Sequence, residues 1–168
     1  MSDEQFDFSR SMGGEALAAR LRRLSERLDR DGTRVYAAQG IHFEQRWYGI
    51  LRQLMERGPL SVGELASLLR ITHASVSETR RSLEKAGVIT ATVAPDDRRR
   101  RTLSLTPQGQ RLCDELAPLW ADFNAAARDL NEEAGDVVRL LDQLEDALAK
   151  RSLYDRITDR AAARGGSS

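Results

Sequence analysis

The chain has 168 residues, of which 31% are charged and 5% aromatic, and its 26 basic and 26 acidic side chains balance at neutral pH. A single cysteine excludes an intramolecular disulfide and a cysteine-rich zinc site, and no apolar run approaches the roughly 20 residues that cross a bilayer. The start MSDEQFDFSR is acidic and polar, unlike a secretion signal. We therefore expect one domain, or one domain with an appended element, located in the cytoplasm.

The balanced net charge hides an uneven distribution along the chain. Residues 70–111 carry 9 basic and 4 acidic side chains, a net charge of +5, whereas residues 112–168 carry 7 basic and 12 acidic ones, a net charge of −5. Such polarity would orient the basic segment toward a polyanion and the acidic segment away from it. The distribution is therefore compatible with nucleic-acid binding.

The first 58 residues predict an arm followed by two helices. Residues 1–14 are polar and are expected to form a flexible arm. From residue 15, leucines recur at helical spacing, at Leu17, Leu21, Leu24 and Leu28. The pair Asp31-Gly32 marks a place where this helix could bend before it continues to Gln39. A second apolar run predicts a helix from Phe43 to Leu54 that ends at Gly58-Pro59.

The next residues predict two short helices joined by a tight turn. Ser61 and Glu64 form a capping box, in which the serine hydroxyl satisfies an amide of the first turn. Thr72 is expected to cap the second helix, which Gly87 ends. The predicted buried faces consist of Leu65, Leu68 and Leu69 on the first helix and of Val76, Leu83 and Ala86 on the second.

The outer face of the second helix is predicted to enter a DNA major groove. Small and polar residues near its N-terminus would allow close approach, and basic residues follow. The candidate DNA contacts on this helix are His73, Ala74, Ser75, Ser77, Glu78, Arg81 and, at its flank, Arg80. The alternatives are exposed serines without a role, an Arg81 paired with Glu78, and a His73 that faces water.

Two alternating stretches after Gly87 predict a β-hairpin. Residues 89–93 and 102–106 alternate apolar and polar side chains, as half-buried strands do. The segment between them, APDDRRRR, predicts a turn that carries four consecutive arginines. A run of charges is often only a solvated loop, but its position after a helix-turn-helix favours a wing that contacts a polyanion.

Asp97, Arg99, Leu105, Thr106 and Gly109 have the spacing Asp-x-Arg, five residues, then Leu-Thr-x-x-Gly. This pattern resembles the wing of the MarR family of winged helix-turn-helix transcriptional regulators, and the resemblance extends from residue 15 to about residue 157. It implies that residues 59–109 form the DNA-binding lobe and that Asp97 and Arg99 pair to brace the wing. Arg98, Arg100 and Arg101 are then left to approach DNA in a minor groove.

The C-terminal part of the chain is predicted to be helical. Thr106 and Pro107 start a helix as N-cap and first residue, and Pro118 is expected to bend it. A break near residues 131–135 precedes a last helix, whose apolar residues continue to Ile157, and residues 159–168 are expected to be a disordered tail.

The apolar stripes in residues 15–58 and 110–158 need a partner surface. The MarR resemblance implies that these helices interleave with those of a second subunit in a dimerisation domain; a monomeric helical bundle is the alternative. A dimer would place two recognition helices on half-sites about 34 Å apart in a palindromic operator.

Four side chains near the junction of the first two helices, Tyr36, His42, Trp47 and Tyr48, are candidates for an effector site. Flat apolar rings with polar tips suit the burial of a small apolar or aromatic molecule, and the family resemblance implies an effector at this junction. Aromatic residues at helical spacing more often fill a core. Cys113 is interpreted as an inert helix residue, because it follows the wing instead of lying in the N-terminal helices, where the family's peroxide sensors carry their reactive cysteine.

The sequence thus predicts a mainly α fold with a small β-hairpin wing, in which a winged helix-turn-helix lobe adjoins a helical dimerisation domain. The predicted function is that of a homodimeric regulator that binds double-stranded DNA, a repressor released by a small-molecule effector. The alternative is a winged-helix protein-interaction module that does not bind DNA. No metal, cofactor or enzymatic activity is expected, because the residues form no tetrahedral ligand set, phosphate-binding loop or nucleophile motif.

Overall fold

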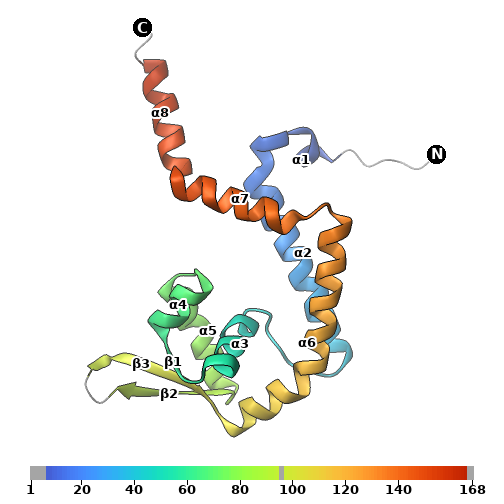
Figure 1. Ribbon diagram of the computed structural model, residues 1–168, viewed down its shortest axis with the longest axis vertical. Helices are drawn as coiled ribbons and strands as arrows, with labels where there is room; N and C mark the ends of the chain where they lie inside the picture. The colour runs from blue at the N-terminus through green and yellow to red at the C-terminus, as the bar shows by residue number, and fades with distance from the viewer. Residues whose placement is uncertain (1–6, 95–96, 166–168) are drawn as a thin grey trace, which may run out of the picture. The chain divides into compact units, whose positions relative to one another are not determined.

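The structure is a computed structural model that describes residues 7–94 and 97–165, and for residues 93–94 and 97–100 it describes the backbone. The chain forms two compact units, Met1–Asp114 and Glu115–Ser168. Helices dominate, and the strands of the described residues form one small antiparallel sheet (Figure 1). The prediction of a mainly α fold with a β-hairpin wing is confirmed.

The N-terminal segment contains more helix than the sequence pattern predicts. Helix α1 (Phe8–Ser11) and the 3₁₀-helix η1 (Gly13–Ala16) precede the long helix α2 (Leu17–Ala38). Residues 8–11, which the sequence analysis assigns to a flexible arm, form α1 instead, and the Asp7 side chain caps this helix by accepting a hydrogen bond from the Arg10 amide at 3.3 Å. Helix α2 runs without a break through Asp31-Gly32, and Gly32 is buried.

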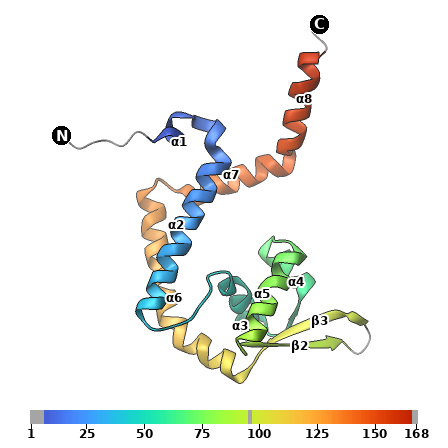
Figure 2. The ribbon, with the colours of Figure 1, turned by 180° about the vertical axis from the view of Figure 1, so that it is seen from behind.

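The predicted order of two short helices followed by a β-hairpin within residues 59–109 is confirmed by α4 (Val62–Leu69), α5 (His73–Lys85), β2 (Ile89–Ala94) and β3 (Asp97–Leu105). Helix α3 (Trp47–Arg57) and a short strand that the sequence does not predict, β1 (Leu60–Ser61), complete this winged-helix lobe. The capping box is present, because the Glu64 amide donates to Ser61 Oγ at 3.2 Å and the Ser61 amide donates to Glu64 Oε2 at 2.7 Å. In both views, α3, α4 and α5 lie together and the β2–β3 hairpin extends away from them (Figures 1 and 2).

The three strands have the order β1-β3-β2, and both pairings are antiparallel. Although β1 has only two residues, it ties the wing to the helices, since Leu60 pairs with Leu103 and Ser61 pairs with Thr102. Ser61 therefore takes part in the sheet and also caps α4.

The strand β3 begins earlier than predicted. The sequence predicts a turn that includes Asp97 to Arg101, but this segment is the first half of β3. The register changes there, because Val93 pairs with Arg101 while Ala94 pairs with Asp97. Side-chain alternation detects a strand only where one face is buried, and a run of arginines shows no alternation even when its backbone pairs.

The core of the lobe is built from the inward faces of its helices and strands. Its residues with at most 2% exposure are Trp47, Ile50, Leu51, Leu65, Val76, Leu83 and Leu103. Leu68, predicted to be part of the buried stripe of α4, is 41% exposed. The inward face of this short helix is therefore narrower than the leucine pattern indicates.

The C-terminal helices are α6 (Pro107–Glu133), α7 (Val137–Lys150) and α8 (Leu153–Gly165). The cap by Thr106 is confirmed, because its Oγ1 accepts from the Gly109 amide at 3.0 Å. Pro118 lies within α6, and the break before α7 falls where expected, at Gly135 and Asp136. The expectation of a disordered tail from residue 159 is wrong as far as Gly165, since α8 extends to that residue. The last three residues lie outside the described part of the chain.

Candidate nucleic-acid interface

The turn between α4 and α5 fixes the orientation of α5 relative to α4. Arg70 ends α4 in the left-handed conformation, with φ of 51°, and Thr72 starts α5 by accepting a hydrogen bond from the Ser75 amide at 3.1 Å. Val76, Thr79 and Leu83 are buried against the rest of the lobe. The opposite face of α5 is therefore left to the solvent.

This outer face carries most of the candidate DNA contacts. Those on α5 that are exposed are His73, Ala74, Ser75, Glu78 and Arg81, and Ser77 is half-buried. The small side chains occupy the first turn of the helix, followed by Glu78 and then by Arg81. Such a face can approach the floor of a major groove closely at its N-terminal end.

Two residues of the predicted set have other contacts. The Arg80 side chain is 15% exposed, and its Nη1 donates to Glu84 Oε2 at 2.6 Å, so it packs along the flank of α5. His73 lies beside α4, where its Cε1 is 3.5 Å from the position that a Cβ on Gly63 would take. Arg81 has no ion pair with Glu78 among the described residues, and the ion pair of Glu78 is with Arg46.

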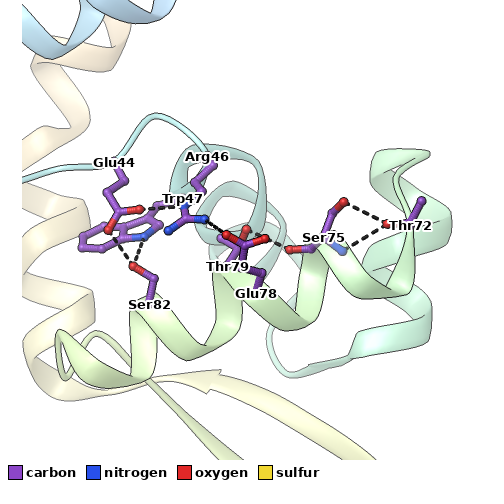
Figure 3. Close-up of polar contacts among 8 residues, drawn as sticks. All are labelled: Glu44, Arg46, Trp47, Thr72, Ser75, Glu78, Thr79 and Ser82. Atoms are coloured by element: carbon purple, nitrogen blue, oxygen red, sulfur yellow. Dashed lines mark hydrogen bonds and ion pairs between the residues drawn. The ribbon is translucent and has the colours of Figure 1, made fainter.

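A polar network connects α5 to the segment before α3 (Figure 3). Nη1 of Arg46 donates to Glu78 Oε1 at 2.6 Å, and Nε of Arg46 donates to Glu44 Oε2, also at 2.6 Å. The other Glu44 oxygen accepts from Ser82 Oγ at 2.6 Å, and Trp47 Nε1 donates to the same Oγ at 3.1 Å. We call these five residues, Glu44, Arg46, Trp47, Glu78 and Ser82, the Arg46 network.

Glu44 and Arg46 of the Arg46 network are both held in their charged forms, because each is hydrogen-bonded to the other and the pKa of Arg46 is raised by its carboxylate partners. The hydrogen bond from Ser82, assisted by Arg46, lowers the pKa of Glu44 below its ordinary value although partial burial acts in the opposite direction. Arg46 and Ser82 were not identified from the sequence. Their partners are 32 and 38 residues away in the chain, so helical periodicity contains no signal for them.

The wing residues divide between described and undescribed side chains. Arg101 is exposed on β3, beside the register change. The side chains of Asp97, Arg98, Arg99 and Arg100 lie outside the described residues, although their backbone belongs to β3. The bracing pair and the two other DNA-contacting arginines therefore remain predictions.

Comparisons with known proteins bear on this lobe directly. Residues 40–100 match the model of the MarR family. FarR of Neisseria gonorrhoeae, an HTH-type transcriptional regulator, is 32% identical over 110 residues, which cover 62% of this chain and 75% of FarR. The chain belongs to the MarR family.

Two further comparisons define how far the likeness extends. A candidate transcriptional regulatory protein for the hcr operon of Thauera aromatica is 33% identical over 99 residues, 58% of this chain but only 60% of that relative. The structure of Bordetella bronchiseptica BpsR, described for the regulation of its DNA binding by 6-hydroxynicotinic acid, matches with a TM-score of 0.64. At 22% identity it covers 84% of this chain and 97% of BpsR, which shows a shared MarR fold.

In this MarR-family chain, the four candidate effector residues occupy different environments. Tyr36 and Trp47 are each 2% exposed, and Phe43 packs between them, with ring centroids 4.6 Å and 5.6 Å away. His42 is exposed and meets Trp47 edge-on at 6.0 Å, and Tyr48 is half-buried. Tyr36 and Trp47 thus form part of an aromatic core.

A hollow of about 460 Å³ lies beside this aromatic core. His42 and Phe43 line it, together with Asp29, Thr33, Ala37, Ile41, Glu44, Gln45 and Arg46. Of the four candidates only His42 belongs to this wall, so the structure brings one of them to the hollow. Glu44 and Arg46 belong both to the wall and to the Arg46 network.

Other kinds of site are absent from the described residues. Within the described ranges, no three potential metal-binding side chains gather, and none of the helices there has the length and apolar character of a membrane span.

Cys113 is fully buried in α6, and burial, with a smaller contribution from Asp114, raises the pKa of its thiol to about 11. A reactive cysteine needs the opposite shift, so the neutral thiol dominates at physiological pH.

The raised pKa of Cys113 predicts a loss of stability in alkaline solution. The folded protein holds the thiol proton to about pH 11 and the unfolded chain to about pH 9.0, so this contribution is complete below pH 9.0 and is lost between those values. Urea unfolding of the wild type and Cys113→Ala from pH 7.5 to 11 measures it. The stability difference between the two proteins should shrink above pH 9.0. A difference that stays constant to pH 11 would contradict the assignment.

Proposed function

We propose that this MarR-family protein is a homodimer that binds palindromic double-stranded DNA in a sequence-specific manner, and that it represses transcription until a small molecule releases it. The observation that carries the DNA-binding part is the outer face of α5, where small residues precede Glu78 and Arg81 on a helix whose start is capped by Thr72. The basic charge of residues 70–111 supports it, because phosphate contacts supply much of the affinity for DNA. Such a regulator acts where the chromosome is, in the cytoplasm.

In this proposal, α5 reads base edges, and His73 and the wing arginines position the lobe on phosphates. Ser75 and Ser77 supply hydroxyl groups near the N-terminus of α5, and Ala74 leaves room for the groove floor. Asp97 and Arg99 brace the wing, while Arg98, Arg100 and Arg101 contact DNA. Arg80 takes part through its flank position, with Glu84 as its partner when DNA is absent.

Selection of genomic fragments by the purified protein tests this function. Fragments bound at about 0.15 M salt should share one palindromic motif. The affinity of the protein for these fragments should exceed its affinity for bulk DNA by a factor of roughly a thousand or more. The identified operator would then be placed upstream of a reporter gene, where the protein should lower expression. If a folded protein enriches no motif above background, the alternative function as a protein-interaction module is favoured.

The dimer is supported by apolar side chains that are exposed in the described part of the chain. Leu17, Leu21, Leu24 and Leu28 of α2 are 38–57% exposed, and α7 and α8 expose Val138, Leu140, Leu153, Tyr154 and Ile157 by 50–74%. Exposed apolar stripes of this length mark interfaces in proteins that stay soluble. Both predicted dimerisation segments therefore offer a surface suited to a second copy.

Replacement of Leu24 by glutamate is expected to weaken the dimer by about a hundredfold or more, because each of two buried leucines contributes roughly 1.5–3 kcal/mol. Sedimentation velocity over a range of concentrations measures the change. Ala19→Glu is the matched control, since Ala19 is exposed on the opposite side of α2. A wild-type monomer, or a Leu24→Glu dimer of unchanged affinity, would refute the proposed interface.

The effector part of the proposal is centred on the hollow beside the aromatic core. Its volume of about 460 Å³ suits a small molecule, and His42 and Phe43 would supply a polar tip and an aromatic wall. The other three candidates are Tyr36, Trp47 and Tyr48. They would affect the effector indirectly, by supporting the side chains of the wall or by changing how those side chains move. An effector that favours a DNA-incompetent arrangement by about 1.4 kcal/mol would weaken operator binding tenfold.

A further inference from the structure

We infer that Glu78 reads a cytosine in each operator half-site, with its carboxylate held in place by the Arg46 network. The inference rests on the proposed DNA binding and adds to it one base, one reading atom and the residues that position that atom. It begins from an unusual feature of the outer face of α5, which is an acidic side chain at its centre (Figure 3).

The position of Glu78 suits a base contact. It lies one turn after Ala74 and Ser75 and one turn before Arg81 and Ser82, and its side chain is 67% exposed. The two small side chains let the start of α5 approach the groove floor, which brings the next turn within reach of base edges. A longer residue at Ala74 would hold the carboxylate away from the bases.

One oxygen of the Glu78 carboxylate already has a hydrogen-bond partner. Its Oε1 accepts from Nη1 of Arg46 at 2.6 Å, whereas Oε2 has no hydrogen-bond partner among the residues that the structure describes. One acceptor atom is thus presented to the groove. Of the four bases, cytosine offers an amino donor in the major groove without an acceptor of its own beside it. Guanine and thymine present acceptor oxygens, and adenine places its N7 acceptor next to its amino group, so these bases repel the carboxylate.

Arg46 reduces the repulsion between an acid on this face and the phosphates of DNA. An unpaired Glu78 carboxylate would be repelled by the phosphates, and the adjacent guanidinium offsets part of its charge, although Arg46 is also paired with Glu44. The pair itself adds little to folding stability, because its side chains are 45% and 67% exposed. Folding stability therefore explains this ion pair poorly. The positioning of the Glu78 carboxylate explains it better.

The remaining residues of the Arg46 network fix the direction of the guanidinium. Glu44 holds Nε of Arg46, and Ser82 holds Glu44. Ser82 is in turn bonded to Trp47, which is 2% exposed and belongs to the core. Glu78 is thus connected to the interior of the lobe through three side chains. A reading group that is fixed before binding loses little conformational freedom on binding, which favours discrimination between bases.

The test measures relative affinities for the selected operator and for each of its single-base variants. In the wild type, replacing one particular C·G pair per half-site should cost roughly tenfold to a hundredfold in affinity. Glu78→Ala should lose the preference at that pair and keep the preferences at all others. Glu78→Gln should shift the preference there toward A·T, because an amide pairs with adenine.

Glu84→Ala is the matched control, because it removes an acid from the same helix that is also ion-paired to an arginine. It should change affinity equally for all operator variants. Arg46→Ala should reduce the preference at the same C·G pair as Glu78→Ala, and the double variant should lose no more of it than Glu78→Ala alone. Full retention of the cytosine preference in Glu78→Ala would overturn the inference. Absence of wild-type binding to any DNA would instead refute the proposed function.

Discussion

Replacement of Gly109 by alanine is expected to destabilise the protein by roughly 3 kcal/mol and to lower its melting temperature by about 10 °C. A Cβ at this position would lie far inside the van der Waals contact distance of the Val88 carbonyl oxygen and 2.9 Å from the Val88 carbonyl carbon. Both are backbone atoms, so no side-chain rotation can relieve the contact. The first turn of α6 would have to move away from the start of β2.

That movement would break the hydrogen bonds that join the two elements. The Thr106 amide donates to the Val88 oxygen at 3.0 Å, and Thr106 Oγ1 donates to the Gly87 oxygen at 2.6 Å. Thermal and urea unfolding followed by circular dichroism measure the cost. Gly63→Ala is the control, because a methyl group on this residue of α4 would meet only ordinary van der Waals contacts, the nearest being His73 Cε1 of α5 at 3.5 Å. The control should be neutral or slightly more stable. A Gly109→Ala protein that melts like the wild type would show that the contact is relieved at no cost.

Among the proposed DNA contacts, the largest loss of DNA affinity is expected when Arg98, Arg100 and Arg101 are all replaced by alanine in one variant. Each lost phosphate contact lowers the slope of log K against log salt by about 0.9, and a dimer carries every substitution twice. One contact per wing thus accounts for a slope change of about 1.8 and, at 0.15 M salt, for roughly thirtyfold in affinity. Three contacts per wing would change the slope by about 5.

Binding of the selected operator between 0.05 and about 0.4 M salt, by fluorescence anisotropy, measures this slope. The exposed arginines 22, 27 and 30 of α2 provide a charge-matched control, whose replacement should leave the slope nearly unchanged provided that the dimer persists. If the wing and α2 variants gave the same small decrease, the arginines would act only through net charge. An unchanged slope in the wing variant would exclude phosphate contacts by the wing.

The features that could be predicted from the sequence are those that short spacings encode. The Ser61–Glu64 capping box and the Thr72 cap each join residues three positions apart, and the buried faces of α3 and α5 follow helical periodicity. The motif that ends in Gly109 was also visible, and the structure adds its reason, the close approach to Val88. Local hydrogen bonds and burial patterns of this kind are determined within one or two turns of chain.

The features that could not be predicted depend on contacts between distant segments. In the sequence, Arg46 is simply a residue near the start of a predicted helix. Its contact with Glu78 exists only because the fold brings the two residues together. The early start of β3 and the end of α8 after residue 158 share another cause, since the sequence of neither segment contains a periodic apolar pattern. The candidate effector rings show the same limit, because periodicity does not distinguish the buried Trp47 from the exposed His42.

The double role of Ser61, which pairs with Thr102 of the wing strand and caps α4, has a consequence for operator architecture. The base of the wing and the start of the helix-turn-helix are joined through one residue, so neither can shift along the duplex without the other. The distance between the groove read by α5 and the groove touched by the wing is then set within each subunit. We expect base insertions inside a half-site to abolish binding, whereas an insertion at the centre of the palindrome is absorbed to the extent that the two lobes can move apart.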